Sequence, residues 1–237
     1  VVISKGKTLG YLAQHQELGG DKSIFDEVLE VKRPLIEMEA KIRRLELDMK
    51  HASGDELENM LSVYSRLNHE FELQNGYAYQ SEVTGVLKGL GFTEEEFTKP
   101  VSALSGGQKT RVSLGKLLLT KPEIILLDEP TNYLDVQHID WLKRYLQEYE
   151  NAFILISHDI PFLNSVINLI YHMENQRLDR YVGDYNKFQE VYAVKKSQLE
   201  AAYKRQQQEI AELEDFVARN KARVATRNMA MSRQKKL

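Results

Sequence analysis

Residues 104–135 read LSGGQKTRVSLGKLLLTKPEIILLDEPTNYLD, and this stretch decides the fold of the chain. A glycine-rich turn precedes a helical pattern that runs to about Leu119, where Lys121 and Pro122 end it. Glycines let another group approach the backbone closely, and the first N–H groups of a helix attract anions. Serine and glutamine side chains add hydrogen bonds. The turn therefore predicts a surface for an anion such as a phosphate, formed by Ser105, Gly106, Gly107 and Gln108.

Two apolar runs end in polar residues. The run IILL (124–127) is followed by Asp128 and Glu129, and the run FILI (153–156) is followed by a serine and His158. Such runs are typical of strands buried on both faces of a parallel sheet, and helical stretches alternate with them here. Ligands bind at the carboxyl ends of such strands. There Asp128 could hold a magnesium ion through its waters, Glu129 could orient or deprotonate a water, and His158 could donate to a γ-phosphate.

Four motifs occur in the order and spacing of an ABC-type ATPase domain, which most of residues 1–184 resembles: LSGGQ, a strand ending in Asp-Glu-Pro, TNYLD and Ser-His-Asp. Residues 11–14, YLAQ, resemble the segment that carries the Q-loop glutamine of that family. The resemblance implies an α/β fold with a parallel sheet core and a helical subdomain. It also implies ATP hydrolysis with Mg²⁺, and a second ABC domain that completes the nucleotide sites.

The resemblance also implies a role for each matching residue. The glycine-rich turn would be the signature motif, which closes over ATP held by the opposite domain. Gln14 and Asp128 would position magnesium and water, and Glu129 would be the general base. Asp135 would be the D-loop residue that reaches across the interface, and His158 would be the γ-phosphate switch. Two of these residues have simpler alternatives: Gln14 could be a polar residue after a strand, and Asp135 could cap a helix.

The opening of the chain contains the tripeptide Gly6-Lys7-Thr8, which matches the end of a P-loop, GxxxxGK[ST]. The template needs a glycine five residues before Gly6, and that position is Val1. A P-loop also opens a helix, whereas residues 8–18 have an extended pattern. We interpret residues 4–7 as a polar turn between two short strands, and we expect the family's P-loop upstream of Val1. On that expectation the chain alone binds ATP weakly and hydrolyses almost none.

Residues 31–75 predict an antiparallel helical hairpin. Apolar residues follow a 3-4-3-4 spacing from Leu35 to Met49, and a similar spacing continues from Leu57 to Phe71. This spacing places an apolar stripe along one side of each helix. Turn residues in HASGD, 51–55, separate the two patterns. The stripes would bury each other, and the hairpin would form an arm inserted in the ATPase domain of residues 1–30 and 76–184.

Shorter patterns predict further elements. A helix over 81–90 stops at Gly91, and Thr93 with Glu96 forms a capping-box pattern for another helix. The segments LIYHM and RLDRYVG, within residues 169–183, predict an antiparallel hairpin.

The charge of the chain is unevenly distributed. Residues 185–237 carry twelve basic and six acidic residues, and the rest carries twenty basic and twenty-nine acidic residues. From Asn186 onward there is no Gly or Pro, which predicts one long helix or a helix with a flexible tip. A basic tail favours a polyanion such as RNA, and a solvated helix end is the simpler alternative. The predicted RNA contacts are Arg219, Lys221, Arg223, Arg227, Arg233, Lys235 and Lys236.

The arm, the segment YVGDY (181–185) and the basic residues after it are together similar to the ABC-F subfamily. That resemblance implies two tandem ATPase domains joined by a helical linker, of which 185–237 would be a part. It also implies a cytoplasmic protein that acts on the ribosome in translation, through antibiotic protection, relief of stalling or another role. ATP would fix arm and linker in a binding geometry, and hydrolysis would release them.

Three other functions remain open. The ATPase subunit of a membrane transporter would have little use for a coiled-coil arm or a basic tail. A DNA-repair or chromosome-maintenance ATPase usually has much longer coils. A nucleotide-independent interaction module would not need the intact Asp128, Glu129 and His158. The chain has no cysteine, which excludes disulfides and thiolate metal sites, and its apolar runs are far too short to cross a bilayer.

Overall fold

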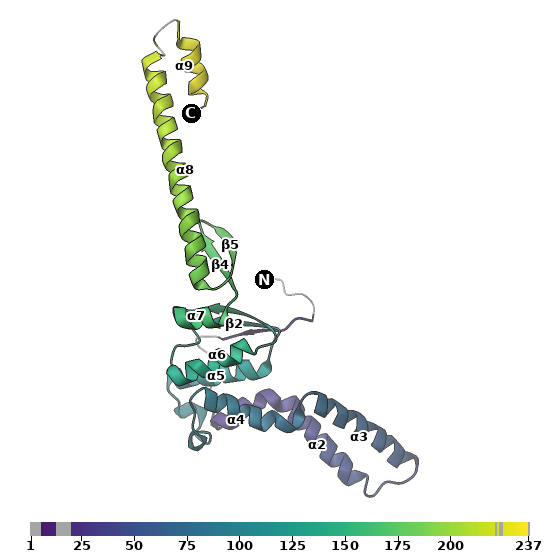
Figure 1. Ribbon diagram of the computed structural model, residues 1–237. Helices are drawn as coiled ribbons and strands as arrows, with labels where there is room; N and C mark the ends of the chain where they lie inside the picture. The colour runs from purple at the N-terminus through teal and green to yellow at the C-terminus, as the bar shows by residue number, and fades with distance from the viewer. Residues whose placement is uncertain (1–5, 13–19, 221, 223–224, 237) are drawn as a thin grey trace. The chain divides into compact units, whose positions relative to one another are not determined.

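The computed structural model describes residues 6–12, 20–220, 222 and 225–236. These residues fall into two compact units, Val1–Val166 and Ile167–Leu237. The elements of the first unit are β1 (Leu9–Tyr11), α1 (Ile24–Leu29), α2 (Arg33–Asp48), α3 (Asp55–Leu73), α4 (Tyr79–Gly89), α5 (Gly106–Thr120), β2 (Ile124–Asp128), α6 (Val136–Gln147), β3 (Ala152–Ile156) and α7 (Ile160–Val166) (Figure 1). Those of the second unit are β4 (Leu169–Glu174), β5 (Arg177–Val182), α8 (Tyr185–Asn220) and α9 (Arg227–Gln234). Among the described residues, no helix combines the length and apolar character that a membrane crossing needs.

The sheet of the first unit is parallel, as predicted, with the order β1-β2-β3. Ile125 and Leu127 of β2 are buried in a core that α5 and α6 share, with Leu118 and Leu142 fully buried beside them. β3 ends at Ile156, where the apolar run ends. The Ser157 hydroxyl accepts a hydrogen bond from the Asp159 N–H, within the turn into α7. The carboxyl ends of β2 and β3 therefore meet at one edge, where Asp128 pairs with Ile156.

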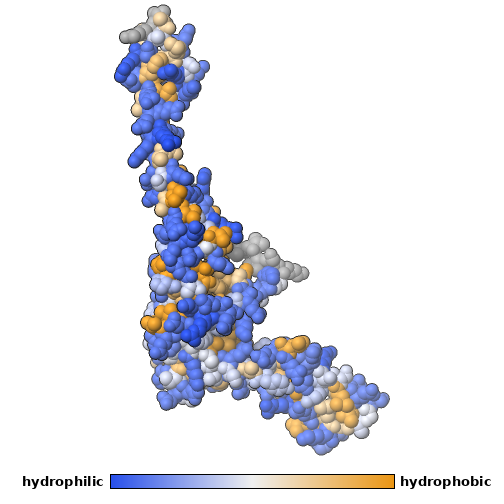
Figure 2. Space-filling model, viewed as in Figure 1, coloured by the Kyte–Doolittle hydropathy of each residue, from blue (hydrophilic) through white to orange (hydrophobic). Residues whose placement is uncertain are grey.

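The predicted arm is confirmed as the antiparallel pair α2 and α3, which lie side by side in Figure 1. Its apolar stripe is most deeply buried at the root, where Leu35, Ile42 and Phe71 pack with Tyr79. Figure 2 shows hydrophilic residues over much of the visible arm surface, with apolar side chains between them. Leu47 and Leu61 are among the exposed apolar side chains. The arm therefore has a buried base and a mixed outer surface.

Three ion pairs connect α1, the root of the arm, α4 and α5. Lys116 of α5 pairs with Glu27 of α1. Lys32, in the 3₁₀ turn that leads into α2, lies 2.8 Å from Glu82 of α4, and Lys121 at the end of α5 lies 3.5 Å from the same carboxylate. Burial raises the pKa of Glu82, but the Lys32 hydrogen bond and charge outweigh it, so the pKa lies below its ordinary value.

Replacing Lys32 with methionine should lower the free energy of unfolding by about 1–3 kcal/mol at neutral pH, because a partly buried carboxylate loses the nearer of its two cations. The lowered pKa of Glu82 means that this stabilisation is present above its ordinary pKa of 4.5 and is lost as the pH falls through the folded-state value. Urea unfolding at several pH values should therefore show the difference between the two proteins shrinking in acid. Lys88→Met, which breaks the exposed pair with Glu94, is the matched control and should cost much less, because solvent screens an exposed pair.

The second unit begins with the predicted hairpin of β4 and β5. Its two turn residues, Asn175 and Gln176, both have positive φ angles, as a tight two-residue hairpin turn requires. His172 and Tyr181 of the hairpin contact the Phe188 ring at the start of α8, at centroid distances of 5.2 and 5.0 Å. These rings hold the base of the long helix against the hairpin.

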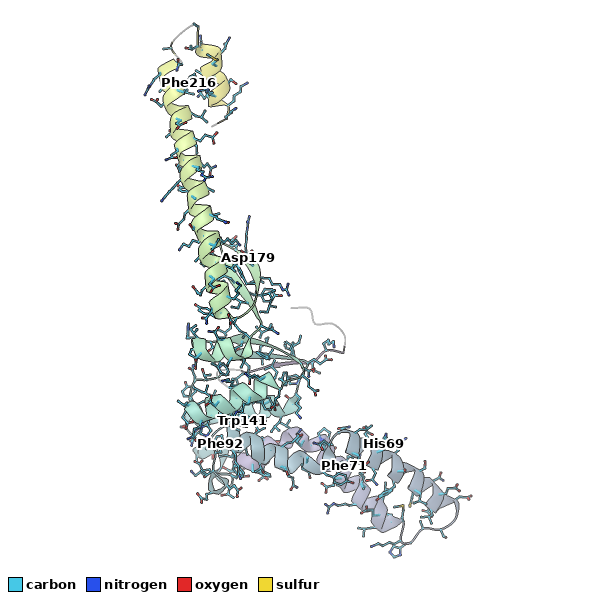
Figure 3. The ribbon with its side chains drawn as sticks, in the orientation of Figure 1. His69, Phe71, Phe92, Trp141, Asp179 and Phe216 are labelled. Carbon is cyan, nitrogen blue, oxygen red and sulfur yellow. The ribbon has the colours of Figure 1, made fainter. Side chains whose placement is uncertain are left out.

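Two sequence-based predictions need correction. The predicted long helix is confirmed as α8, but it ends at Asn220, and the described residues beyond it form α9, which folds back against the end of α8. Ala230 is fully buried there, and the Arg233 guanidinium lies 3.8 Å from the centre of the Phe216 ring (Figure 3). The capping box at Thr93 is present, but it starts only a 3₁₀ turn, Glu94–Glu96.

Candidate nucleotide site

The start of α5 combines helix capping with free N–H groups. The Ser105 hydroxyl accepts a hydrogen bond from the Gln108 N–H at 3.3 Å, and Gln108 Oε1 accepts one from the Ser105 N–H at 3.0 Å. The two side chains thus cap the helix reciprocally. The first N–H groups of a helix have no acceptor within it. Those of Gly106 and Gly107 are therefore suited to an anion, as the sequence predicts.

The two glycines of this turn are needed for different reasons. A Cβ on Gly107 would lie 2.8 Å from the Tyr133 ring, so the space at Gly107 is filled from within the chain. A Cβ on Gly106 would meet no described atom within 4 Å. Nothing in the described chain therefore requires glycine at position 106. The open face of Gly106 is suited to close approach by a group from outside.

Glu129 follows β2 in a strained conformation, with φ +46°. Its N–H donates to the carbonyl of Ile156 at 2.8 Å, which holds the turn against β3. Its Oε2 accepts from the His158 N–H at 3.3 Å and from the Ser157 hydroxyl at 3.5 Å. Its Oε1 is buried and has no hydrogen-bond partner among the described residues. A carboxylate with one occupied and one unused oxygen is suited to receive a proton from a water molecule.

His158 lies beside this carboxylate on the same edge of the sheet. Its Nε2 is 3.6 Å from Glu129 Oε1, and its side chain is 99% exposed. The imidazole is therefore held near Glu129 by its backbone and is open to a ligand. The structure brings together Glu129 and His158 as the sequence predicts, and it places Asp128 at the end of β2 beside them.

Asp135 is the N-cap of α6, so the simpler alternative for this residue is observed. Its Oδ1 accepts from the His138 N–H at 3.2 Å, and His138 Nδ1 lies 2.6 Å from the same oxygen. The Asp135 side chain is nevertheless 66% exposed. A second role at an interface between domains stays a prediction.

The donor set of this edge fits a magnesium ion that is shared with phosphates. No group of three or more His, Asp or Glu residues that could hold a metal occurs in the described ranges. Mg²⁺ usually keeps several waters and takes only one or two protein carboxylates together with phosphate oxygens. Asp128 can supply such a carboxylate. The other predicted magnesium residue, Gln14, lies outside the described residues.

The described residues among the predicted RNA contacts lie at the end of α8, in α9 and directly after α9. Arg219 pairs with Asp215 at 2.8 Å but keeps three quarters of its side chain exposed, and Arg233 stacks on Phe216. The other described residues among the predicted RNA contacts are all exposed: Arg227, Lys235 and Lys236. Lys221 and Arg223 lie outside the described residues.

Some residues of the site were not predicted. Ser157 contacts Glu129, and its position next to His158 was the only sequence pattern that pointed to it. Tyr133, with φ +70°, covers Gly107, and no sequence pattern indicates that conformation. The side chains of Arg111 and His138 meet at Gly91 behind the rim of the site, through contacts between helices far apart in sequence.

Comparisons with known proteins agree with this geometry. Two family models, both described as ABC transporter, match residues 3–132 and 171–237. The chain is 61% identical over 234 residues to the uncharacterized ABC transporter ATP-binding protein YfmM of Bacillus subtilis, covering 99% of this chain and 45% of that protein. It is 39% identical over 183 residues to ABC transporter F family member 2 of Dictyostelium discoideum, covering 76% of this chain and 30% of that protein. The chain thus spans less than half the length of these relatives.

A solved structure shows the same fold. The RNase-L Inhibitor structure matches with a TM-score of 0.50 and 18% identity, covering 81% of this chain and 31% of that one. At this level of identity the match concerns the fold alone.

Proposed function

The chain belongs to the ABC transporter family of ATP-binding proteins, in its F subfamily, and on that premise we propose that it forms part of an ATPase that acts on the ribosome. The proposed ATP hydrolysis is supported by the contact between Glu129 and His158, at the edge of the sheet where a nucleotide would bind. The exposed basic side chains of α9 support the ribosomal half.

In the proposed reaction Glu129 acts as the general base. Its unpaired Oε1 accepts a proton from the attacking water, while its Oε2 stays fixed by Ser157 and His158. The exposed imidazole of His158 donates to the phosphate that is transferred. Asp128 and Gln14 would hold Mg²⁺, which neutralises charge on the phosphates when it is bound.

The signature turn and Asp135 would serve a different ATP, held by a second ABC domain. The N–H groups of Gly106 and Gly107 lie at a helix start, where the helix dipole favours a phosphate. The open face of Gly106 leaves room for that phosphate to approach. ATP would therefore draw the two domains together, and hydrolysis would let them separate.

The ribosome would be bound through the arm and the basic tip of α8 and α9. Folded RNA is recognised largely by shape and backbone, so exposed cations are sufficient for contacts with its phosphates. The arm offers a mixed polar and apolar surface, with Leu47 and Leu61 exposed between charged residues.

The basic tip can be tested by ribosome pelleting of the full-length protein with ATP at several salt concentrations. Replacing Arg227, Lys235 and Lys236 with glutamine should weaken binding and should reduce the steepness of its salt dependence, because fewer phosphate counterions are released. The matched control replaces Lys22, Lys88 and Lys99 with glutamine, which changes the net charge equally but leaves α9 intact. Equal salt dependence for wild type and tip variant would contradict the proposed RNA contact.

A further inference from the structure

A junction behind the signature turn connects three helices of the first unit. Arg111 lies on α5 one turn after Gly107, and its side chain reaches the end of α4. Its Nη1 donates to the carbonyl of Leu90 at 3.0 Å and to that of Gly91 at 3.5 Å. Its guanidinium carbon also lies 4.9 Å from the centre of the Phe92 ring (Figure 3). Arg111 thus binds two carbonyls just past the end of α4, where the partial negative charge of a helix end favours a cation.

Gly91 is the point where this junction reaches α6. Its φ is +86°, and a Cβ there would lie 2.8 Å from Arg111 Nη1 and 2.7 Å from His138 Cε1. The Gly91 backbone is therefore packed between the two side chains. Any larger residue would be strained by its φ angle and would displace Arg111 or His138.

His138 connects Gly91 to Asp135, which lies at the exposed start of α6. Its ring is about one quarter exposed, and its Nδ1 and backbone N–H both face Oδ1 of Asp135. Both groups of His138 face the same carboxylate oxygen, and the Asp135 side chain stays mostly exposed. His138 therefore fixes the direction of this carboxylate without covering it.

We propose that Arg111 and His138 are positioning residues that hold the signature turn and the Asp135 carboxylate in one fixed geometry through Gly91. The proposal rests on the proposed function, in which both rim elements serve ATP held by a second ABC domain. Arg111 anchors the helix that presents Gly106 and Gly107. His138 anchors the carboxylate, and both press on Gly91 in the turn after α4.

The junction explains why a buried arginine occupies position 111, although Arg111 has no role in the proposed reaction. Arg111 Nε is buried without a hydrogen-bond partner in the described part of the chain, so its guanidinium is committed to this packing position despite that cost. An arginine with a planar fork and a stacking face can bind two carbonyls and Phe92 together, whereas a lysine ammonium cannot. The residue type thus matches the geometry of the junction.

The test uses the full-length protein with Glu129→Gln, so that single-turnover hydrolysis reports the ATP that faces this signature turn. His138→Leu and Arg111→Lys should each reduce the rate at saturating ATP by roughly tenfold to a hundredfold, the loss expected when reacting groups shift by about 1 Å. The ATP concentration for half-maximal rate should change little in both variants. The melting temperature should change little in His138→Leu and should fall in Arg111→Lys, because two carbonyls lose their donor. His138→Asn should recover most of the rate, because its amide N–H can replace the Nδ1 donor.

Two further variants sharpen the result. The double variant Arg111→Lys/His138→Leu should lose less than the product of the two single losses, because both act through Gly91. Arg144→Leu, an exposed change elsewhere on α6, is the matched control and should keep the parent rate.

Rates within twofold of the parent for both single variants would overturn the proposal, as would losses explained entirely by a smaller folded fraction. If Arg111→Lys fails to fold, the single-turnover rates of His138→Leu and His138→Asn are compared instead. Equal rates for these two variants would overturn the proposal. Failure of the proposed function would look different, because the protein without any of these substitutions would then hydrolyse no ATP.

Discussion

Glu129→Gln, combined with the matching substitution in a second ABC domain, should reduce ATP hydrolysis by at least about a hundredfold while leaving ATP binding intact. Glutamine has nearly the same shape, so its side-chain oxygen can still accept hydrogen bonds from Ser157 and from the His158 N–H. It cannot take a proton from water. Single-turnover hydrolysis, with nucleotide binding measured in parallel, separates these two effects.

The control for Glu129 is a glutamate of the same unit outside the site. Glu148→Gln changes an exposed side chain at the end of α6 and should leave both hydrolysis and binding unchanged. A hydrolysis rate within threefold of the parent after Glu129→Gln combined with the matching substitution in the second domain would mean that another group is the base.

Gly106→Asp should abolish the ATP-driven closure of the signature turn without harming the fold. A carboxylate at this position would repel the phosphate that the helix start is suited to bind, and a loss of at least about a hundredfold is expected, as for other preorganised donors to a developing charge. In the folded chain the new side chain meets no described atom within 4 Å of its Cβ. An acidic residue in the first turn also stabilises a helix by about 0.3–1 kcal/mol. The melting temperature should therefore stay the same or rise.

Gly107→Ala provides the contrast for Gly106→Asp. Its Cβ would lie 2.8 Å from the Tyr133 ring, so this variant should lower the melting temperature by displacing the ring. The melting temperature should therefore fall in Gly107→Ala, whereas in Gly106→Asp it should stay the same or rise. Normal hydrolysis in Gly106→Asp would contradict the role of the turn as a phosphate surface.

The parts of the fold that the sequence predicts correctly are those with a repeating local pattern. The arm follows from two apolar stripes, and β2 and β3 follow from continuous apolar runs whose ends place Asp128 and His158 on one edge. The helix start at Ser105 also follows from local chemistry, because its capping residues are three positions apart. Local patterns carry such information since the contacts that form them are close in sequence.

The parts that could not be predicted depend on contacts between distant residues. The return of α9 onto α8 depends on the burial of Ala230 and the stacking of Arg233 on Phe216, and no local pattern indicates either. The positive φ angle of Glu129 is held by a hydrogen bond to Ile156 of another strand. The pairing of Asp135 with His138 is local, but the packing of the His138 ring on Gly91, in the turn after α4, joins residues far apart in sequence.

The most direct test of the account is ribosome pelleting of the full-length protein with Glu129→Gln and the matching substitution in the second domain. ATP should close the two domains and, because hydrolysis is blocked, hold the arm and the basic tip on the ribosome. The account predicts co-sedimentation with ATP, little without it, and a decline as salt rises. A protein that stays in the supernatant with and without ATP would contradict action on the ribosome, even if its ATP binding were normal.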